Sequence, residues 1–183
     1  GLAARSSSGT YYDRFRQRLM FPIRNLEGAV VGFGGRTIPG LGGSKYEGPK
    51  YLNSIETEAF SKRRLVYALD LARRAIQDSG CAIVVEGYMD ALALHQHGVT
   101  NAVASMGTSL TPEQGRSLAR YAGRVVLAYD ADAAGKSATL RGMELLGSTG
   151  LEVSVLALPE GEDPDSFVRR HGAEAFRRLV EGA

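Results

Sequence analysis

The sequence predicts an α/β fold built on a mainly parallel, four-stranded sheet with flanking helices. After residue 80, short apolar runs rich in β-branched residues alternate with helical segments, as the buried strands of a parallel sheet do. Three of these runs are followed by acids, which are Glu86, then Asp130 and Asp132, then Asp163 and Asp165. Ligands of such sheets bind outside the carboxyl ends of the strands, so the acids mark the expected site.

The expected strands of this sheet cover residues 81–85, 101–105, 124–129 and 152–158. The helices between them are expected over residues 88–97, 112–122 and 133–146. Thr111 caps the second helix, with Pro112 at its first position and Gln114 completing an approximate capping box. Residues 167–180 predict two short helices broken at His171-Gly172.

The first part of the chain predicts a smaller, mixed α/β subdomain. Two apolar runs, 19–23 and 29–33, flank the turn residues 25–28 and predict a β-hairpin. Residues 34–44 are rich in glycine and predict a mobile loop, and an apolar stripe predicts one helix over 57–77. We therefore expect a basic N-terminal subdomain at 1–79, a catalytic domain at 80–160, and at 161–183 the last acidic motif with the start of a helical subdomain.

The charge of the chain is unevenly distributed, although its net value is only +2. Residues 1–74 contain 13 Lys and Arg against 6 Asp and Glu, whereas residues 75–183 contain 9 against 14. A basic module that guides a polyanion to an acidic catalytic module would explain this division, and so would a chance distribution of surface charge.

The composition excludes several classes of protein. No apolar stretch is long enough to span a bilayer, and the first residues lack the apolar core of a signal peptide. We therefore expect a cytoplasmic protein with no membrane partner. The only cysteine, Cys81, excludes a disulfide and a cysteine-based zinc site within this chain, and is expected to be a small buried apolar residue.

The acidic residues at the strand ends predict a divalent-metal site. Asp130 and Asp132 are two residues apart, so in extended backbone both carboxylates point the same way. Repeated carboxylates at one sheet edge are costly unless a cation lies among them. Taken singly, each has an alternative: Glu86 as a solvated loop residue, Asp132 as the cap of the next helix, and Asp165 or Ser166 as the cap of the last helices.

Magnesium, or manganese in its place, is the metal that this composition favours. Magnesium binds through a few carboxylates plus substrate phosphates, and two such ions can stabilise the attacking and leaving oxygens of a phosphoryl transfer. Three histidines and one cysteine give little support for zinc. The segment Ala134-Gly135-Lys136-Ser137 resembles the end of a P-loop, but Asp130 stands where its first glycine is required.

The basic residues of the N-terminal part are interleaved with aromatic residues. Cations for phosphates and aromatic faces for unpaired bases are typical of a groove that binds single strands, although aromatic residues more often pack in a core. Lys50 and Asn53, in a polar stretch beside the glycine-rich segment, are candidates for contact with a nucleotide or a strand.

The motifs around these residues resemble a known family. The segments VEGYMD (85–90) and YDAD (129–132) are similar to the Toprim signature of bacterial primases, topoisomerases, certain nucleases and recombination mediators. Further segments resemble the bacterial replicative DNA primases of the DnaG type; they are RFRQRLMFPI (14–23), GFGGR (32–36), PKYLNS (49–54), AVASMGT (102–108) and GEDPD (161–165). The resemblance runs from about residue 11 to the end of the chain.

The resemblance implies roles for particular residues. Glu86, Asp130 and Asp132 match the catalytic metal-binding acids of the family, and Asp163 and Asp165 match a second acidic set. Asp90 belongs to the signature but is expected inside a helix, with a structural or supporting role. Positions on family motifs near the template or the incoming nucleotide are Arg14, Arg18, Arg36, Lys50, Asn53 and Lys62.

The family implies a metal-dependent nucleotidyltransferase that makes short RNA primers from ribonucleoside triphosphates on single-stranded DNA. Its replicative helicase and single-strand binding protein would bind through regions outside this chain, and its location would be the nucleoid at replication forks. The chain lacks the zinc-binding and helicase-binding parts of the family, so we expect a core fragment with weak or no activity alone. A Toprim nuclease or topoisomerase, or a non-catalytic Toprim binding module, are the alternatives.

Overall fold

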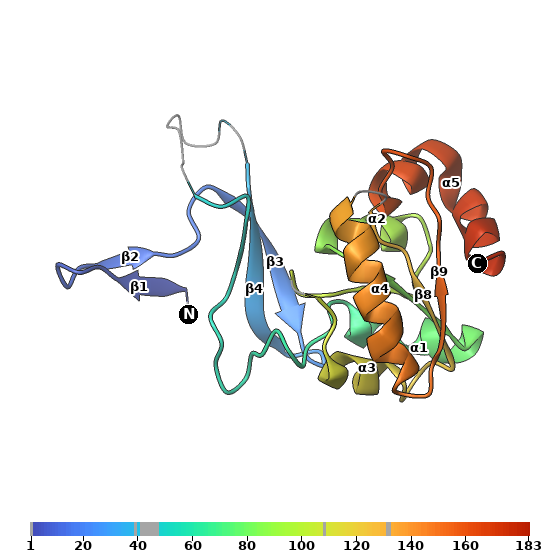
Figure 1. Ribbon diagram of the computed structural model, residues 1–183. Helices are drawn as coiled ribbons and strands as arrows, with labels where there is room; N and C mark the ends of the chain where they lie inside the picture. Colours follow the sequence, from blue (N-terminus) through green and yellow to red (C-terminus); the bar gives the residue numbers. More distant parts are fainter. Residues whose placement is uncertain (1, 39, 41–47, 108, 131–132) are drawn as a thin grey trace. The chain divides into compact units, whose positions relative to one another are not determined.

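The computed structural model describes residues 2–38, 40, 48–107, 109–130 and 133–183. The chain divides into two compact units, Gly1–Ser61 and Lys62–Ala183. Figure 1 colours the first unit blue to cyan and the second green to red, and each unit is described separately below.

The first unit is built from antiparallel strands in its described residues. Strand β3 (Arg18–Arg24) pairs with β4 (Val30–Thr37), which pairs with β5 (Tyr51–Asn53). The turn between β3 and β4 ends at Gly28, which has a φ of 83°, so the predicted hairpin is confirmed. A separate hairpin of β1 (Ala3–Arg5) and β2 (Tyr11–Asp13), and the strand β5, were not predicted.

Part of the expected glycine-rich loop is strand. Gly34 and Gly35 belong to β4, which continues to Thr37. A Cβ on Gly35 would lie 2.9 Å from side-chain atoms of both Phe15 and Arg18. These glycines therefore allow close packing over β4, and the prediction of a loop from residue 34 was wrong because glycine was taken only as a sign of mobility. Residues 39 and 41–47 lie outside the described part.

The second unit has the predicted parallel sheet of four strands, in the order β7-β6-β8-β9. The strands are β6 (Cys81–Val85), β7 (Ala102–Ala104), β8 (Arg124–Leu127) and β9 (Glu152–Val155). All three pairings are parallel, so the carboxyl ends of the four strands lie at one edge. Strand β9 is the most exposed of the four, whereas all of β7, Ala82–Val85 of β6 and 125–127 of β8 are almost inaccessible to solvent.

Helices connect the strands of the second unit as predicted. They are α2 (Tyr88–Gln96), α3 (Pro112–Leu118) and α4 (Ala133–Gly147). Helix α2 packs with α5 (Pro164–Glu181) and α3 packs with α4, so the sheet is covered on both faces (Figure 1). The Thr111 capping box is present, and α5 is kinked at Gly172, whose φ is 81°. Both predictions are confirmed. Across the described residues, no helix combines the length and apolar character needed to cross a bilayer.

The helix expected over residues 57–77 is shorter than predicted. Helix α1 covers Leu69–Ser79, and Ala68 before it has a left-handed φ of 63°. The backbone of Tyr67 instead pairs with Ala104 of β7, through hydrogen bonds of 2.9 and 3.1 Å in the two directions. Pairing with the sheet edge therefore overrides the apolar stripe that suggested helix before Leu69, and α1 belongs to the second unit.

Candidate metal and nucleotide site

Glu86 and Asp130 meet at the carboxyl ends of the two central strands. Glu86 directly follows β6, and Asp130 comes three residues after the end of β8. The backbone N–H of Asp130 donates to Glu86 Oε1 at 3.3 Å. Tyr129 before it is buried, and burial, with a smaller contribution from the charge of Glu86, raises the pKa of its phenol. The parallel register thus brings two of the predicted acids into contact.

Asp90 joins this group from the first turn of α2. Burial, followed by the charges of Asp130 and Asp163, raises the pKa of Asp90 to about 7, while the backbone N–H of Asp165 acts in the opposite direction. The shift means that the second and third acidic clusters lie near one carboxyl group, so this edge of the sheet is strongly negative. Asp90 was expected to have a structural or supporting role, and its carboxyl group lies within electrostatic range of Asp130, Asp163 and Asp165. The position of Asp90 in the first turn of a helix could have indicated this from the sequence, because side chains there point back toward the start of the helix.

Asp163 caps α5 as well as carrying charge. Its Oδ1 accepts a hydrogen bond from the backbone N–H of Ser166 at 2.6 Å. In turn, the Ser166 hydroxyl oxygen accepts a hydrogen bond from the Asp163 backbone N–H at 3.0 Å. Asp165 lies one residue into the helix and is paired with Arg169. The sequence alternative named Asp165 or Ser166 as the cap, whereas Asp163 is the capping residue, because Pro164 occupies the first helical position.

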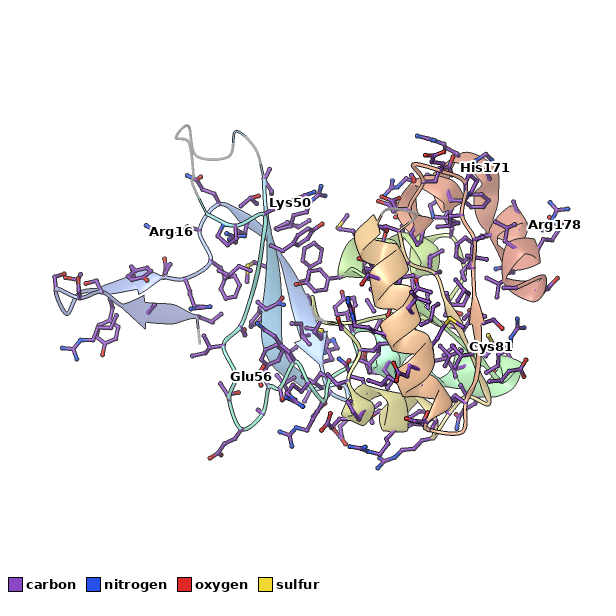
Figure 2. The ribbon with its side chains drawn as sticks, viewed as in Figure 1. Arg16, Lys50, Glu56, Cys81, His171 and Arg178 are labelled. Carbon is purple, nitrogen blue, oxygen red and sulfur yellow. The ribbon has the colours of Figure 1, made fainter. Side chains whose placement is uncertain are left out.

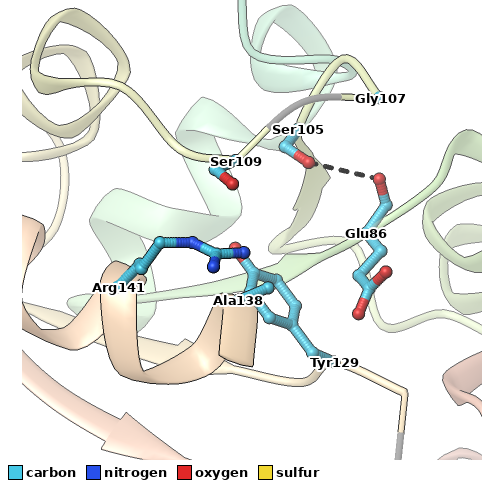
Figure 3. Close-up of a pocket in the computed structure, with 7 residues that line it drawn as sticks. All are labelled: Glu86, Ser105, Gly107, Ser109, Tyr129, Ala138 and Arg141. Carbon is cyan, nitrogen blue, oxygen red and sulfur yellow. Dashed lines mark hydrogen bonds between the residues drawn. The ribbon is translucent and has the colours of Figure 1, made fainter. Parts of the chain in front are cut away.

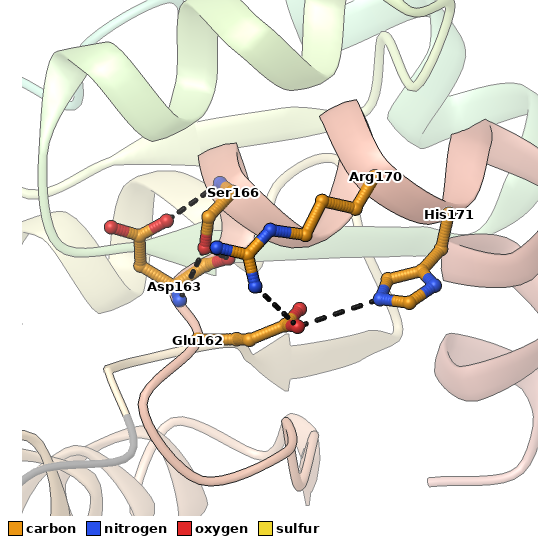
Figure 4. A network of polar contacts seen from close by, with 5 residues as sticks. All are labelled: Glu162, Asp163, Ser166, Arg170 and His171. Atoms are coloured by element: carbon orange, nitrogen blue, oxygen red, sulfur yellow. Dashed lines mark hydrogen bonds and ion pairs between the residues drawn. The ribbon is translucent and has the colours of Figure 1, made fainter.

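Glu162 is held away from this group by two basic side chains. Its Oε1 lies 3.0 Å from Arg170 Nη1 and 3.4 Å from His171 Nε2, as Figure 4 shows. The Glu162 side chain is only 12% exposed, so it is anchored in an ion-pair network and does not act as solvated loop charge. The network fixes the loop that delivers Asp163 to the acidic edge.

The donors at this edge suit a hard divalent cation. They are all carboxylates, and the pKa of Asp90 is raised first by burial and then by the charges of Asp130 and Asp163, whose repulsion a cation would relieve. Among the described residues, no three Asp, Glu, His or Cys side chains converge as a ready-made metal site. Asp132, predicted as a ligand, lies outside the described residues. The donor chemistry therefore fits magnesium or manganese, with substrate oxygens and water as further ligands.

A pocket of about 310 Å³ opens beside Glu86 (Figure 3). Ser105, Gly107 and Ser109, which come after β7, form one wall, and Tyr129 with Ala138 and Arg141 of α4 form the others. The Ser105 hydroxyl donates to the Glu86 carbonyl at 3.2 Å and ties this wall to the end of β6. Arg141 of α4 also lines the pocket. Neither Ser105 nor Arg141 was a predicted site residue, because Ser105 was the last residue of the strand predicted over 101–105 and Arg141 lies within a helix.

Two arginines of the first unit are used largely to hold its own backbone. Arg18 is 8% exposed, and its guanidinium donates to the carbonyls of Gly35 at 3.1 Å and Pro49 at 2.8 Å. Arg14 is half-buried and donates to the carbonyl of Asn53 at 3.3 Å. Arg18 thus joins β4 to the residues just before β5, and Arg14 holds the end of β5. The predicted contacts of Arg14, Arg18 and Asn53 with nucleic acid stay predictions.

Arg36 and Lys50 lie at the face of an aromatic residue in the first unit. The Arg36 guanidinium is 5.9 Å and the Lys50 ammonium 5.8 Å from the ring centroid of Tyr51, which is 40% exposed. Figure 2 labels Lys50 and Arg16 on this unit. Lys62, the other predicted cation, begins the second unit, and its carbonyl accepts the Gln114 side-chain amide at 2.9 Å. Arg36, Lys50 and Tyr51 form a cationic, aromatic surface suited to phosphates and bases.

Comparison with known families gives two matches that follow each other along the chain. Residues 1–73 match the N-terminal domain of the DNA primase catalytic core, and residues 83–168 match the Toprim-like family. A DNA primase of Clostridium acetobutylicum is 51% identical over 94% of this chain, and one of Halalkalibacterium halodurans is 48% identical over 99%. The chain spans 28% and 29% of the length of these two relatives.

Solved structures give the same result. The zinc-binding and RNA polymerase domains of Aquifex aeolicus primase align with a TM-score of 0.91 and 39% identity, over 99% of this chain and 44% of the other. The structure of a DnaG primase catalytic domain bound to single-stranded DNA aligns with a TM-score of 0.88 and 43% identity, over 100% of this chain and 58% of the other.

Proposed function

Because the chain belongs to the DnaG-type family of bacterial DNA primases, we propose that it forms part of a primase catalytic core. The activity would be the synthesis of short RNA primers on a single-stranded DNA template during replication. The observation that carries this proposal is the gathering of Glu86, Asp90, Asp130 and Asp163 at one edge of the Toprim-like sheet.

The proposed reaction is a nucleotidyl transfer. The 3′-hydroxyl of the growing primer loses its proton, and its oxygen forms a bond to the α-phosphorus of a ribonucleoside triphosphate. The bond from the α-phosphorus to the bridging oxygen of the β-phosphate breaks, and pyrophosphate leaves. Catalysis of this kind depends mainly on positioning and on stabilising the developing charge.

Glu86, Asp130, Asp132, Asp163 and Asp165 are the residues that we propose hold magnesium, or manganese in its place. Bound there, the ion would lower the pKa of the attacking hydroxyl and neutralise the leaving phosphates. The chain's own residues supply the frame: the N–H of Asp130 orients the Glu86 carboxylate, and the cap formed by Asp163 fixes the start of α5. The chain is proposed to need no zinc of its own.

The first unit is proposed to bind the template and the incoming nucleotide. Arg36 and Lys50 flank the exposed Tyr51 ring, which supports contact with phosphate and base, and Lys62, Asn53, Arg14 and Arg18 are the further candidates. A relative in this family was solved with single-stranded DNA bound. The replicative helicase and single-strand binding protein would bind to regions outside this chain, and the proposed location is the nucleoid in the cytoplasm.

The division of labour along the chain is also proposed. Residues 1–79 would contact template and nucleotide, residues 80–160 would carry the catalytic Toprim domain, and residues 161–183 would add the second acidic motif. The contact-based division at Ser61 supports a separate basic module and adds α1 to the catalytic part.

Replacement of Asp130 in the full-length protein tests this proposal. Asp130→Asn removes one negative charge at nearly constant volume, so primer synthesis with ribonucleotides, single-stranded template and magnesium is expected to fall more than about a hundredfold. Binding of single-stranded DNA should remain, because the proposed strand contacts lie on other residues.

Asp78→Asn is the matched control, because Asp78 is an exposed aspartate paired with Arg74 on α1. It should leave synthesis unchanged. Undiminished synthesis by Asp130→Asn would contradict the assignment. Plasmid cleavage or relaxation by the wild type, without primer synthesis, would indicate a Toprim nuclease or topoisomerase, and strand binding with no activity of either kind would indicate a binding module.

A further inference from the structure

The pocket beside Glu86 contains a cation that the proposed metal site does not use. Arg141 lies in the third turn of α4, and its side chain reaches into the pocket from the side opposite Glu86 (Figure 3). Of the described residues that line the pocket, Arg141 is the one that carries a positive charge. Its guanidinium therefore faces the same small space as Glu86, one of the candidate metal-binding acids.

Arg141 forms one side-chain hydrogen bond and, among the described residues, no ion pair. Its Nη1 donates to the Ser137 hydroxyl, one helical turn earlier, at 2.7 Å. No carboxylate of the described residues lies within ion-pair distance of it. A guanidinium has five N–H donors, so most remain for a ligand. Arg141 is exposed to solvent at the pocket wall, and an oriented arginine that forms no ion pair with a described carboxylate is suited to bind an anion.

The other pocket walls are also suited to phosphate. Ser105 and Ser109 contribute hydroxyl groups. The buried ring of Tyr129 forms the part of the pocket wall between Glu86 and Arg141. The volume of about 310 Å³ is at the lower end of the range for small-ligand sites. It suits the terminal, charged part of a small molecule better than a continuous strand, which lies along an open groove.

We propose that Arg141 binds the triphosphate of the incoming nucleotide, on the side of the pocket opposite Glu86. This inference rests on the proposed function, and it identifies where the leaving pyrophosphate is held. The planar guanidinium can bind two phosphate oxygens at once, which fixes the phosphate chain as well as attracting it. Glu86 and Arg141 would then lie on opposite sides of the phosphates, with Arg141 acting as a substrate-binding residue.

Ligand binding to the 183-residue chain tests the proposal. We would titrate wild type and Arg141→Gln with ATP, AMP and inorganic tripolyphosphate, each with magnesium, by isothermal titration calorimetry. The variant is expected to bind ATP and tripolyphosphate roughly tenfold more weakly, because one charge-assisted bidentate contact is lost, and to bind AMP as the wild type does. Arg141→Lys should fall between the two, since it keeps the charge without the fork.

Arg120→Gln is the matched control, because Arg120 is an exposed arginine of the same unit that does not line the pocket. It should bind all three ligands as the wild type does. Equal affinity of wild type and Arg141→Gln for ATP would overturn the proposal, as would absence of ATP and tripolyphosphate binding in the wild type. If Arg141→Gln lost binding of a single-stranded oligonucleotide but bound ATP as the wild type does, the proposal would be overturned in favour of a contact between Arg141 and the strand backbone.

Kinetics of the full-length protein separate this inference from the proposed function. Arg141→Gln should raise the KM for ribonucleotides roughly tenfold in primer synthesis. An unchanged KM in an enzyme that Asp130→Asn inactivates would remove the role of Arg141 and leave the primase assignment intact. No primer synthesis by the wild type would remove the primase assignment itself, whatever the binding results.

Discussion

At the scale of single residues, the site depends on one close backbone approach as well as on its acids. Gly135 lies in the first turn of α4, and a Cβ there would be 2.1 Å from the Asp130 carbonyl oxygen and 3.0 Å from Glu86 Oε1. The segment that resembles the end of a P-loop therefore needs glycine for packing against Asp130. Phosphate binding by that loop does not explain it. The sequence excluded the P-loop but did not explain the glycine, because the explanation is how closely the start of α4 approaches the Asp130 carbonyl and the Glu86 side chain in the fold.

Asp90 gives a prediction of pH dependence at this scale. Its pKa is about 7 in the folded protein against an ordinary 3.8, so the folded chain keeps this proton after the unfolded chain has lost it. The free energy of unfolding should therefore fall as pH rises from about 4 to 7, and level off above that range. Asp90→Asn removes this effect. In metal-free buffer it should be more stable than wild type by on the order of 2 kcal/mol at pH 8, after allowance for solvent screening of a half-exposed group.

Urea unfolding of both proteins at pH 4, 5, 6, 7 and 8, in the presence of a chelator, measures this difference. The difference in free energy of unfolding between Asp90→Asn and wild type should grow between pH 4 and 7. Saturating magnesium at pH 8 should reduce this difference, because a cation also relieves the repulsion. Asp78→Asn, at an exposed ion-paired position, should run parallel to the wild type. A constant gap between Asp90→Asn and wild type at all five pH values would show that Asp90 does not titrate as proposed.

At the scale of elements, the start of α5 serves two purposes. Asp163 is the helix cap through Oδ1, and it is also one of the charges that raise the pKa of Asp90. One residue therefore couples the position of the last helix to the acidic edge of the sheet. The Glu162 network with Arg170 and His171 holds the preceding loop in the same position (Figure 4).

The two roles of Asp163 can be separated by substitution. Asp163→Ser keeps an oxygen that accepts the Ser166 N–H, so its stability without metal should stay within about 0.5 kcal/mol of wild type. Asp163→Ala removes the cap and should lower the free energy of unfolding by about 1 kcal/mol, offset in part by the lost repulsion between Asp163 and Asp90. Both variants should lose most of the rise in Tm that magnesium gives the wild type. Thermal unfolding with and without magnesium measures both effects, and a full magnesium response in Asp163→Ser would exclude Asp163 as a ligand.

The sequence was most informative about elements where local signals agree with the fold. The four parallel strands, the Thr111 cap and the kink at Gly172 follow from apolar runs, a capping box and a glycine. The prediction of helix before Leu69 was wrong, because the pairing of Tyr67 with Ala104 is a contact between residues distant in sequence. The short strands β1, β2 and β5 have no alternating apolar pattern, since most of their residues are exposed, and they could not be predicted in that way.

The candidate site was predicted only where local sequence signals indicate it. Glu86 and Asp130 follow buried strands directly or within three residues, so parallel pairing brings them together, whereas Asp163 also depends on the loop before α5. Arg141 lies eleven residues beyond Asp130 on a helix, and the packing of α4 on β8 and β9 places it at the pocket. Residues delivered by helix packing carry no comparable local signal.

At the scale of the whole molecule, the division of contacts differs from the boundary expected at residue 79. The unit Lys62–Ala183 includes α1, whose Leu69, Ala72 and Ile76 are buried. It also includes two carbonyl partners of the fully buried Gln114 side chain, those of Lys62 at 2.9 Å and Leu65 at 2.7 Å. The segment before Gly80 thus completes the core and hydrogen bonding of the sheet unit.

Two shortened chains test which boundary makes an independent unit. A piece covering residues 62–183 keeps α1, the Tyr67–Ala104 pairing and both Gln114 contacts, so we expect it to unfold cooperatively in urea and to keep its stabilisation by magnesium. A piece covering 80–183 exposes the apolar surface that α1 covers and leaves a buried amide without its partners. It should be less stable by at least about 3 kcal/mol, or fail to fold. Circular dichroism and amide NMR spectra of the two pieces measure this, and equal stability would place the boundary at Gly80, with α1 an accessory to the sheet.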